Sequence, residues 1–312
     1  MDKSNATLDR MLTFVRVVER GSLSAVAREL GLGQSTVTRQ LKELEEAVGV
    51  PLLSRTTRRV AVTGEGLRYY ANCLNILRLV EQAQDEARSI HSAPAGNVRV
   101  SCTSAFGVMH LCRVLFAFQM RYPEIGIDLN LTDERIDLPR EGVDIAIRLG
   151  PLNDSSMKLR ALGMSRRLLV ASPKYLVTAG RPEVPDDVST HESIRMTNVA
   201  GSQILELLAP DGQHRIVRLN GKFRVDHGLA ARQALAAGVG IAPAHRWLVD
   251  DLLTAGQLEV LLPDYDLTAV PLSMLIVPER ADVSRVRLLV DFLAEQISTI
   301  PGWPAPRTDT SS

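Results

Sequence analysis

Residues 34–66, QSTVTRQLKELEEAVGVPLLSRTTRRVAVTGEG, place a short helix directly before a basic hairpin. From Gln34 to about Val48 apolar residues recur at steps of four, three and four, which predicts one amphipathic helix. These apolar residues are Val37, Leu41, Leu44 and Val48. Gly49 ends the helix, and Pro51 prevents it from resuming.

The residues after Pro51 predict a small β-wing. Two apolar segments, 52–53 and 60–62, flank the polar, basic stretch Arg55-Thr56-Thr57-Arg58-Arg59, a pattern typical of two strands joined by a turn. Upstream, apolar stripes predict a helix over residues 8–20 and a second over 23–30, with Ser22 as the N-cap of the second. Three helices followed by a basic wing resemble a winged helix-turn-helix, in which the third helix enters the DNA major groove.

A long helix is predicted from Thr63, at the N-cap position, to about His91. Its roughly 28 residues would make a rod about 42 Å long. Two apolar stripes run along it, so we expect it to bury surface against a partner, and a dimer is the economical explanation. The stripes are Leu67, Tyr70, Leu74 and Leu77, and Ile76, Val80, Ala83, Ala87 and Ile90.

The sequence changes character after residues 92–97, a hinge of small residues, Pro and Gly. Strand and helix patterns alternate from there, which predicts a parallel, doubly wound α/β sheet. Two turn pairs, Asp211-Gly212 and Asn220-Gly221, predict hairpins, the second pairing residues 216–219 with 222–225.

Composition excludes several classes of protein. The 312 residues carry 36 Lys and Arg against 36 Asp and Glu, so the whole chain is no polybasic binder of nucleic acid or membrane surfaces, and any such activity must be local. Three scattered cysteines indicate neither a disulfide framework nor a thiol metal site. Charges interrupt the first 25 residues, and no apolar run reaches about 18 residues, so we expect a cytoplasmic protein that spans no membrane.

The leading end of the third helix holds the candidate DNA contacts, because its amides, hydroxyls and cations can reach base edges or phosphates. The candidates are Gln34, Ser35, Thr36, Thr38, Arg39 and Lys42, with Arg55, Arg58 and Arg59 from the wing. The alternatives are a solvated helix face and an exposed charge cluster. Arg55 is equally suited to packing inside the wing.

These residues also identify a family. Residues 8–66 resemble the amino-terminal domain of LysR-type transcriptional regulators, and the resemblance extends to about residue 300. The motifs include Gly21-Ser22-Leu23-Ser24-Ala25, Gln34-Ser35, Arg39-Gln40, Leu44-Glu45, Arg55-Thr56-Thr57-Arg58 and Thr63-Gly64-Glu65-Gly66. Leu53, where the family usually has Phe, and Val26, in place of an Ala, depart from the pattern but stay apolar.

The resemblance implies a fold of three parts: an N-terminal winged helix-turn-helix domain (1–63), a linker and dimerisation helix (64–92), and a C-terminal two-lobed α/β effector-binding domain (93–300) shaped like a type 2 periplasmic binding protein. Residues 301–312 form a tail. Lobe I covers about 96–163 and 269–300, and lobe II about 164–268. The two connections between the lobes fall near 161–166 and 265–271.

Effector-cleft positions follow from the same resemblance, and they lie where ligands of such modules bind, at the carboxyl ends of strands. They are Thr103, Ser104, Thr132, Arg148, Thr197, Asn198, Asp226 and His227. Free N–H groups and hydroxyls suit an anionic or carboxylate-bearing small molecule. The alternatives are helix caps, satisfied loop polars, and an ion pair of Arg148 with a neighbouring acid. Asp226-His227 departs from the family's commoner Asn-Asp, and a turn histidine exposed to solvent is one alternative for His227.

Enzyme signatures are incomplete. Ser155-Ser156-Met157-Lys158 matches S-x-x-K without its companion motifs, and Gly238-Val239-Gly240 has Pro243 in place of the third glycine of a dinucleotide fingerprint. We therefore expect no enzyme, cofactor or metal site. A solute-binding or enzymatic α/β module with a helical appendage and an architectural DNA binder remain the competing hypotheses.

The leading hypothesis is a sequence-specific transcriptional regulator controlled by a small molecule bound between two lobes. Its expected partners are a double-stranded DNA operator, the effector and further copies of the chain, as a homodimer or homotetramer. RNA polymerase is a further candidate partner. The sequence leaves open the effector, the operator, and whether the protein activates or represses.

Overall fold

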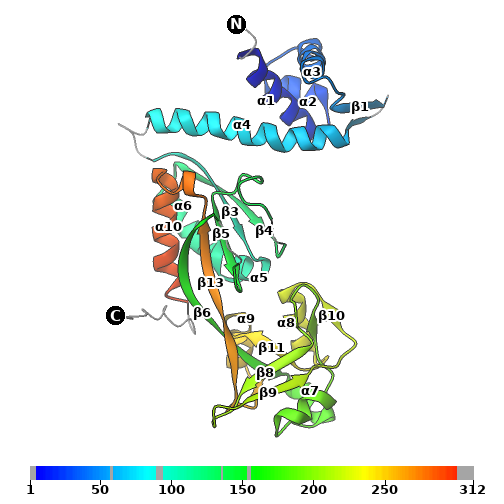
Figure 1. Cartoon of the computed structure of the whole chain (residues 1–312), viewed down its shortest axis with the longest axis vertical. Coiled ribbons are helices and arrows are strands. Elements are labelled where there is room, and N and C mark those ends of the chain that lie inside the picture. Colours follow the sequence, from blue (N-terminus) through cyan, green and yellow to red (C-terminus); the bar gives the residue numbers. More distant parts are fainter. Residues whose placement is uncertain (1–4, 57–58, 89–93, 135, 153–155, 301–312) are drawn as a thin grey trace. The chain divides into compact units, whose positions relative to one another are not determined.

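The computed structural model describes residues 5–56, 59–88, 94–134, 136–152 and 156–300 (Figure 1). The chain divides into two compact units. Unit 1 is Met1–Ala93 with Ile136–Gly142, and unit 2 is Pro94–Arg135 with Val143–Ser312. Each unit is described by itself.

Unit 1 begins with three helices and a two-stranded wing. The helices are α1 (Asn5–Arg20), α2 (Leu23–Glu29) and α3 (Gln34–Val48). The strands β1 (Leu53–Thr56) and β2 (Arg59–Val62) pair antiparallel. The sequence predicts all five elements, but α1 begins earlier than expected, at Asn5, and the strands include Arg55, Thr56 and Arg59, which were predicted to form the tip of the wing.

Local sequence explains the ends of these helices. Ser22 caps α2, because its hydroxyl accepts the N–H of Ala25 at 3.3 Å. Gly49 ends α3 in the left-handed conformation, with φ +83°, which other residues rarely adopt. The predicted inner face of α3 lies in the core of the unit, where Val37, Leu41 and Leu44 are buried.

The linker helix α4 (Gly64–Arg88) follows the wing. Thr63 caps it by accepting the N–H of Gly66 at 2.9 Å, as predicted. The apolar side chains of α4 divide between the core and the surface. Tyr70, Leu74 and Leu77 pack against the core of unit 1, whereas the exposed apolar side chains of α4 include Leu67, Ile76 and Leu79.

Unit 2 is built around a mixed sheet in which the strand order is β11-β6-β13-β5-β3-β4. Only β4, β3 and β5 run parallel to one another, and β6, β13 and β11 are antiparallel to their neighbours. Within the described residues the sheet has nine strands in all, so the expectation of a parallel, doubly wound sheet holds for these three strands and is wrong for the other six. The strands are β3 (Gly96–Cys102), β4 (Ile125–Leu131), β5 (Ile145–Leu149), β6 (Lys158–Ala171), β11 (Ala242–His245) and β13 (Asp266–Ile276).

The long strands β6 and β13 join the two lobes (Figure 1). Their pairing continues through the predicted crossings near 161–166 and 265–271. The register shifts where Leu272 opposes Gly163 and Ser273 opposes Ala161, which is a β-bulge. Gly163 has φ +135°, a conformation that favours glycine at this bulge.

Lobe I is completed by helices on the sheet. A continuous helical run consists of α5 (Ser104–Phe106), a π-helical turn (Gly107–Leu111) and α6 (Cys112–Arg121). The last helix, α10 (Ser284–Ile297), buries one apolar face, which includes Val286, Leu289 and Leu293. A short 3-10 turn, Pro278–Arg280, follows β13 and carries the buried Arg280.

In lobe II one of the two predicted hairpins forms and the other does not. The turn at Asp211-Gly212 does join β8 (Ile204–Leu208) to β9 (His214–Arg218), but residues 216–219 do not pair with 222–225. The strand β10 (Arg224–Val225) instead runs parallel to β7 (Arg195–Met196). The other elements of lobe II are α7 (Pro173–Ala179), the 3-10 turn Pro185–Thr190, α8 (Gly228–Ala237), α9 (Arg246–Thr254) and β12 (Glu259–Leu261).

Candidate functional site

The outer face of α3 carries the predicted DNA-contact residues. Gln34, Ser35, Arg39 and Lys42 are exposed, and Thr36 and Thr38 are half-buried. No side chain caps the helix at Gly33, so its first N–H groups remain available to a phosphate.

Two weak pairs restrain the cations of this face. Arg39 lies 3.9 Å from Glu43, and Lys42 lies 3.6 Å from Glu46, each one helical turn away. Pairs as exposed as these contribute about 0.3–0.5 kcal/mol, so DNA phosphates can compete for both cations.

The wing is fixed to α3 by the carboxylate of Glu45, a role that its place in the motif Leu44-Glu45 did not reveal. Glu45 Oε1 accepts the N–H of Leu52 at 2.8 Å and that of Leu53 at 3.0 Å. The two residues open the wing, so this carboxylate sets its position relative to the helix. In the backbone ladder Arg55 pairs with Val60, and Arg59 pairs with Thr56; Arg58 lies outside the described residues.

In lobe I the structure brings together the residues predicted at the strand ends. The N–H of Thr132 donates to Cys102 O at 2.9 Å, which joins the ends of β3 and β4. Thr103 Oγ1 is buried and has no hydrogen-bond partner among the described residues. Burial raises the pKa of the neighbouring Cys102 thiol to about 12, so this thiol remains protonated.

Arg148 is held inside lobe I. Its Nη2 donates to Ser101 Oγ at 2.7 Å and its Nη1 to Ile147 O at 3.1 Å. Burial lowers the pKa of Arg148, while the charge of Asp133 acts in the opposite direction. Within the described residues no ion pair joins Arg148 to an acid, in contrast to one of the alternatives drawn from the sequence.

Asp133 changes the electrostatics expected at this position. Its Oδ1 accepts the N–H of Ser104 at 3.1 Å, so a carboxylate already occupies the start of α5. The sequence had led us to expect free N–H groups at the start of this helix that could bind an anionic ligand. Asp133 directly follows the candidate Thr132, and that adjacency was the available sequence signal.

The predicted residues of lobe II also lie together. Thr197 donates its N–H to Val225 O at 2.8 Å, and Asn198 Nδ2 donates to Asp226 O at 2.7 Å. His227 is the N-cap of α8, where its Nδ1 accepts the N–H of Leu229 at 3.3 Å. The helix-cap alternative therefore describes His227, whose side chain is half-buried in this position.

Lobes I and II meet through α5, α8 and α9. A Cβ added to Gly228 would lie 3.1 Å from the Cβ of Ala105, so the start of α8 lies against α5. His110, in the π-helical turn, forms a 3.1 Å hydrogen bond with Trp247 O in α9. The effector candidates of the two lobes thus border a common region of unit 2.

The described part of the chain also bears on metal binding and membrane spanning. No group of three or more His, Cys, Asp or Glu side chains there is placed to hold a metal ion. No helix in the same residues has both the length and the apolar composition needed to span a membrane.

A winged helix-turn-helix unit on the same chain as a two-lobed α/β unit with polar strand ends defines a ligand-responsive DNA-binding regulator. Two family models match: the bacterial regulatory helix-turn-helix protein, lysR family, over residues 8–67, and the LysR substrate binding domain over residues 91–298. The chain belongs to the LysR family of transcriptional regulators, which confirms the resemblance read from the sequence.

Relatives match over nearly the whole chain. The chain is 34% identical over 292 residues to the HTH-type transcriptional regulator CrgA of Neisseria meningitidis serogroup C (strain 8013), which covers 93% of this chain and 96% of that protein. It is 31% identical over 288 residues to the HTH-type transcriptional activator AaeR of Escherichia coli (strain K12), covering 92% and 93%.

Solved structures give the same result. The structure of CrgA from Neisseria meningitidis superposes with a TM-score of 0.61 at 31% identity, covering 93% of this chain and 98% of that one. The full-length Vibrio cholerae virulence activator AphB superposes with a TM-score of 0.60 at 26% identity, covering 92% and 98%. The expected fold class, with its N-terminal winged domain and C-terminal two-lobed domain, is confirmed.

Proposed function

We propose that the leading face of α3 reads the base edges of an operator while the wing contacts the backbone or minor groove beside it. The reading residues are Gln34, Ser35, Thr36, Thr38, Arg39 and Lys42, and the wing residues are Arg55, Arg58 and Arg59. Residues 1–63 form the DNA-binding domain, 64–92 the linker, 93–300 the effector domain and 301–312 a tail.

One observation carries this proposal. Gln34, Ser35 and Arg39 are exposed on the same helix whose Val37 and Leu41 are buried, so packing of the unit uses only the opposite face. Exposed polar side chains held by no more than a weak surface pair, on a helix of groove-fitting diameter, are available to base edges.

The effector is proposed to bind where the two lobes adjoin, among Thr103, Ser104, Thr132, Arg148, Thr197, Asn198, Asp226 and His227. The unpartnered, buried hydroxyl of Thr103 supports a ligand at this position. For the signal to pass, the effector must bind one conformation of the regulator more tightly than another. The protein senses this molecule without transforming it, in the cytoplasm, where its DNA lies.

A homodimer through α4 is the assembly that the linker supports. Ile76 and Leu79, three positions apart and so on one face of this helix, are exposed, with relative exposures of 37% and 55%. A second copy of the helix would cover them. Two winged domains related by a two-fold axis would bind an inverted repeat with half-sites spaced by about one helical turn. A tetramer and a contact with RNA polymerase are further proposals for the assembled regulator.

The experiment first identifies the operator and then tests whether Gln34 contacts its bases. DNA fragments enriched by immunoprecipitation of the full-length protein are compared with scrambled duplexes by fluorescence anisotropy at fixed salt. Gln34→Ala should reduce the preference for the enriched fragment by about 5- to 100-fold, since a bidentate base contact contributes about 1–3 kcal/mol of discrimination. Glu46→Gln, at the far end of α3, is the matched control and should retain the preference.

Two outcomes would contradict the proposal. Equal discrimination by Gln34→Ala and the unmodified protein would remove Gln34 from the base-reading face. If no genomic fragment were enriched over bulk DNA, the chain would be an architectural binder without sequence preference.

A further inference from the structure

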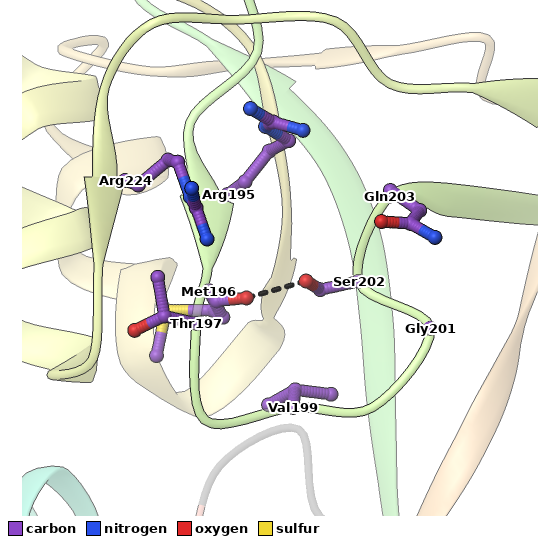
Figure 2. A pocket seen from close by; sticks show the side chains of 8 residues that line it. All are labelled: Arg195, Met196, Thr197, Val199, Gly201, Ser202, Gln203 and Arg224. Atoms are coloured by element: carbon purple, nitrogen blue, oxygen red, sulfur yellow. Dashed lines mark hydrogen bonds between the residues drawn. The ribbon is translucent and has the colours of Figure 1, made fainter.

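Lobe II contains a pocket in which arginine is the only charged residue type. The cavity of about 160 Å³ is formed by β7, the turn 197–203 and β10 (Figure 2). Its lining includes Arg195, Arg224 and Gln203 but no residue of lobe I. The pocket is therefore a feature of lobe II alone.

Strand pairing places the two arginines side by side. Arg195 is the register partner of Arg224, and Met196 is the partner of Val225. Met196 and Val225 pack against the apolar core. Because side chains alternate along a strand, both arginines leave the opposite face of the two-stranded sheet. Adjacent strands lie about 4.8 Å apart, so the fold holds two cations next to each other.

Neither arginine of this pair has an ion-pair partner within the described parts of the chain. Arg195 Nη2 donates to Gly221 O at 2.8 Å, whereas its Nε is buried without a hydrogen-bond partner among the described residues. Like charges on paired positions repel, and a buried donor without an acceptor is unfavourable.

Neutral groups complete the pocket. Ser202 Oγ donates to Met196 O and so closes the turn (Figure 2). Thr197 and Gln203 are the neutral polar side chains of the lining that can still form hydrogen bonds with a ligand. An oxyanion between the guanidinium groups would satisfy Arg195 Nε and cancel the repulsion, because guanidinium groups bind carboxylate and phosphate oxygens through paired, charge-assisted hydrogen bonds.

We propose that this pocket binds a compact oxyanion, a carboxylate or phosphate group, between Arg195 and Arg224. The inference deepens the proposed function, and it depends on that function only in taking the occupant to be part of the effector. It also places the anionic group in lobe II, away from the start of α5, where the carboxylate of Asp133 would repel it.

The test measures anion binding by the full-length protein in the absence of DNA. Isothermal titration calorimetry at constant ionic strength uses inorganic phosphate in one arm and succinate in the other. We expect saturable binding of one anion per chain in at least one arm. Arg224→Gln should weaken it at least tenfold, because this exposed side chain can be replaced without loss of a hydrogen bond described in the fold. Arg195→Gln should weaken it similarly.

Arg215→Gln is the matched control. Arg215 is an exposed arginine on β9 of the same lobe and does not line the pocket, so its removal changes the net charge equally and should alter the affinity less than twofold. Arg195 bonds to Gly221, so if Arg195→Gln failed to fold, Arg224→Gln would decide the question alone.

Every outcome of this experiment either supports the anion site or contradicts it. Binding of phosphate only indicates a free phosphate or phosphorylated ligand, and binding of succinate only indicates a carboxylate ligand; both support the site. No saturable binding in either arm, equal affinity in Arg224→Gln, or an equal loss in Arg215→Gln would overturn it. Since DNA is absent, failure here leaves operator recognition untouched, and failure to find an operator leaves the anion site untouched.

Discussion

Replacing Glu45 tests whether one carboxylate fixes the wing on α3. Its Oε1 accepts two backbone N–H groups, from Leu52 at 2.8 Å and Leu53 at 3.0 Å. A hydrogen bond to a charged group contributes about 1.5–3 kcal/mol, and one half-buried oxygen shared by two donors falls toward the lower end. We therefore expect Glu45→Ala to lower the free energy of unfolding of unit 1 by about 2–3 kcal/mol.

The isosteric variant separates geometry from charge. Glu45→Gln retains an acceptor oxygen at the same place, so its loss should be about 1 kcal/mol. Glu46→Ala is the control, because it removes an equal charge from the same end of α3 and only an exposed pair with Lys42, at 3.6 Å; its effect should stay within about 0.5 kcal/mol.

Hydrogen exchange of the wing amides is the direct assay, since the N–H groups of Leu52 and Leu53 lose their acceptor in Glu45→Ala. DNA affinity should fall as well, while the slope of log affinity against log salt should stay constant, because Glu45 contacts no phosphate. If Glu45→Ala and Glu46→Ala exchanged equally fast, the wing would be held by other contacts and the reasoning would be wrong.

Three further predictions concern the wing and unit 2. Arg58→Ala should weaken binding to all duplexes and reduce the salt slope by about one contact, and an unchanged slope would exclude Arg58 from the interface. Arg280→Met should lower the free energy of unfolding by about 3–5 kcal/mol in urea, because Arg280 and Asp144 form a 2.6 Å pair with only 3% and 2% exposure; adding Asp144→Asn should recover part of the loss, and no recovery would contradict this account. Burial lowers the pKa of His245 to about 4, so the unfolded chain takes up a proton near pH 6.5 and the folded chain does not. Stability is therefore complete above pH 6.5 and falls toward pH 4 by on the order of 3 kcal/mol, a decline that His245→Gln should flatten in pH-dependent denaturation.

Unit 1 could be predicted closely because its signals are local. The apolar spacing between Gln34 and Val48, the stop at Gly49 and the cap at Thr63 each act within a few residues, and the structure confirms all three. The role of Glu45 was missed, because its partners seven and eight residues away become neighbours only when the chain turns at Pro51.

Unit 2 could be predicted in outline only. Asn220-Gly221 has the sequence of a tight hairpin, yet the N–H of Leu219 donates to Gln203 O, and β10 pairs with β7 from an earlier part of the chain. Pairings between distant segments outweigh a local turn preference, and a single sequence does not reveal them. For the same reason the neighbouring arrangement of Arg195 and Arg224 was not predicted.

The paired crossings of β6 and β13 have a mechanical consequence. A hydrogen-bonded ribbon resists stretching and sliding, because either would break its ladder, but it can flex where the bulge at Gly163 has already interrupted the register. Rotation about that point would act as a lever, with displacements that grow toward the far ends of the lobes. A molecule bound between the lobes would then fix the angle between the two lobes rather than the distance between them. A small change in the size of that molecule would displace the far ends of the lobes more than the parts next to the ribbon.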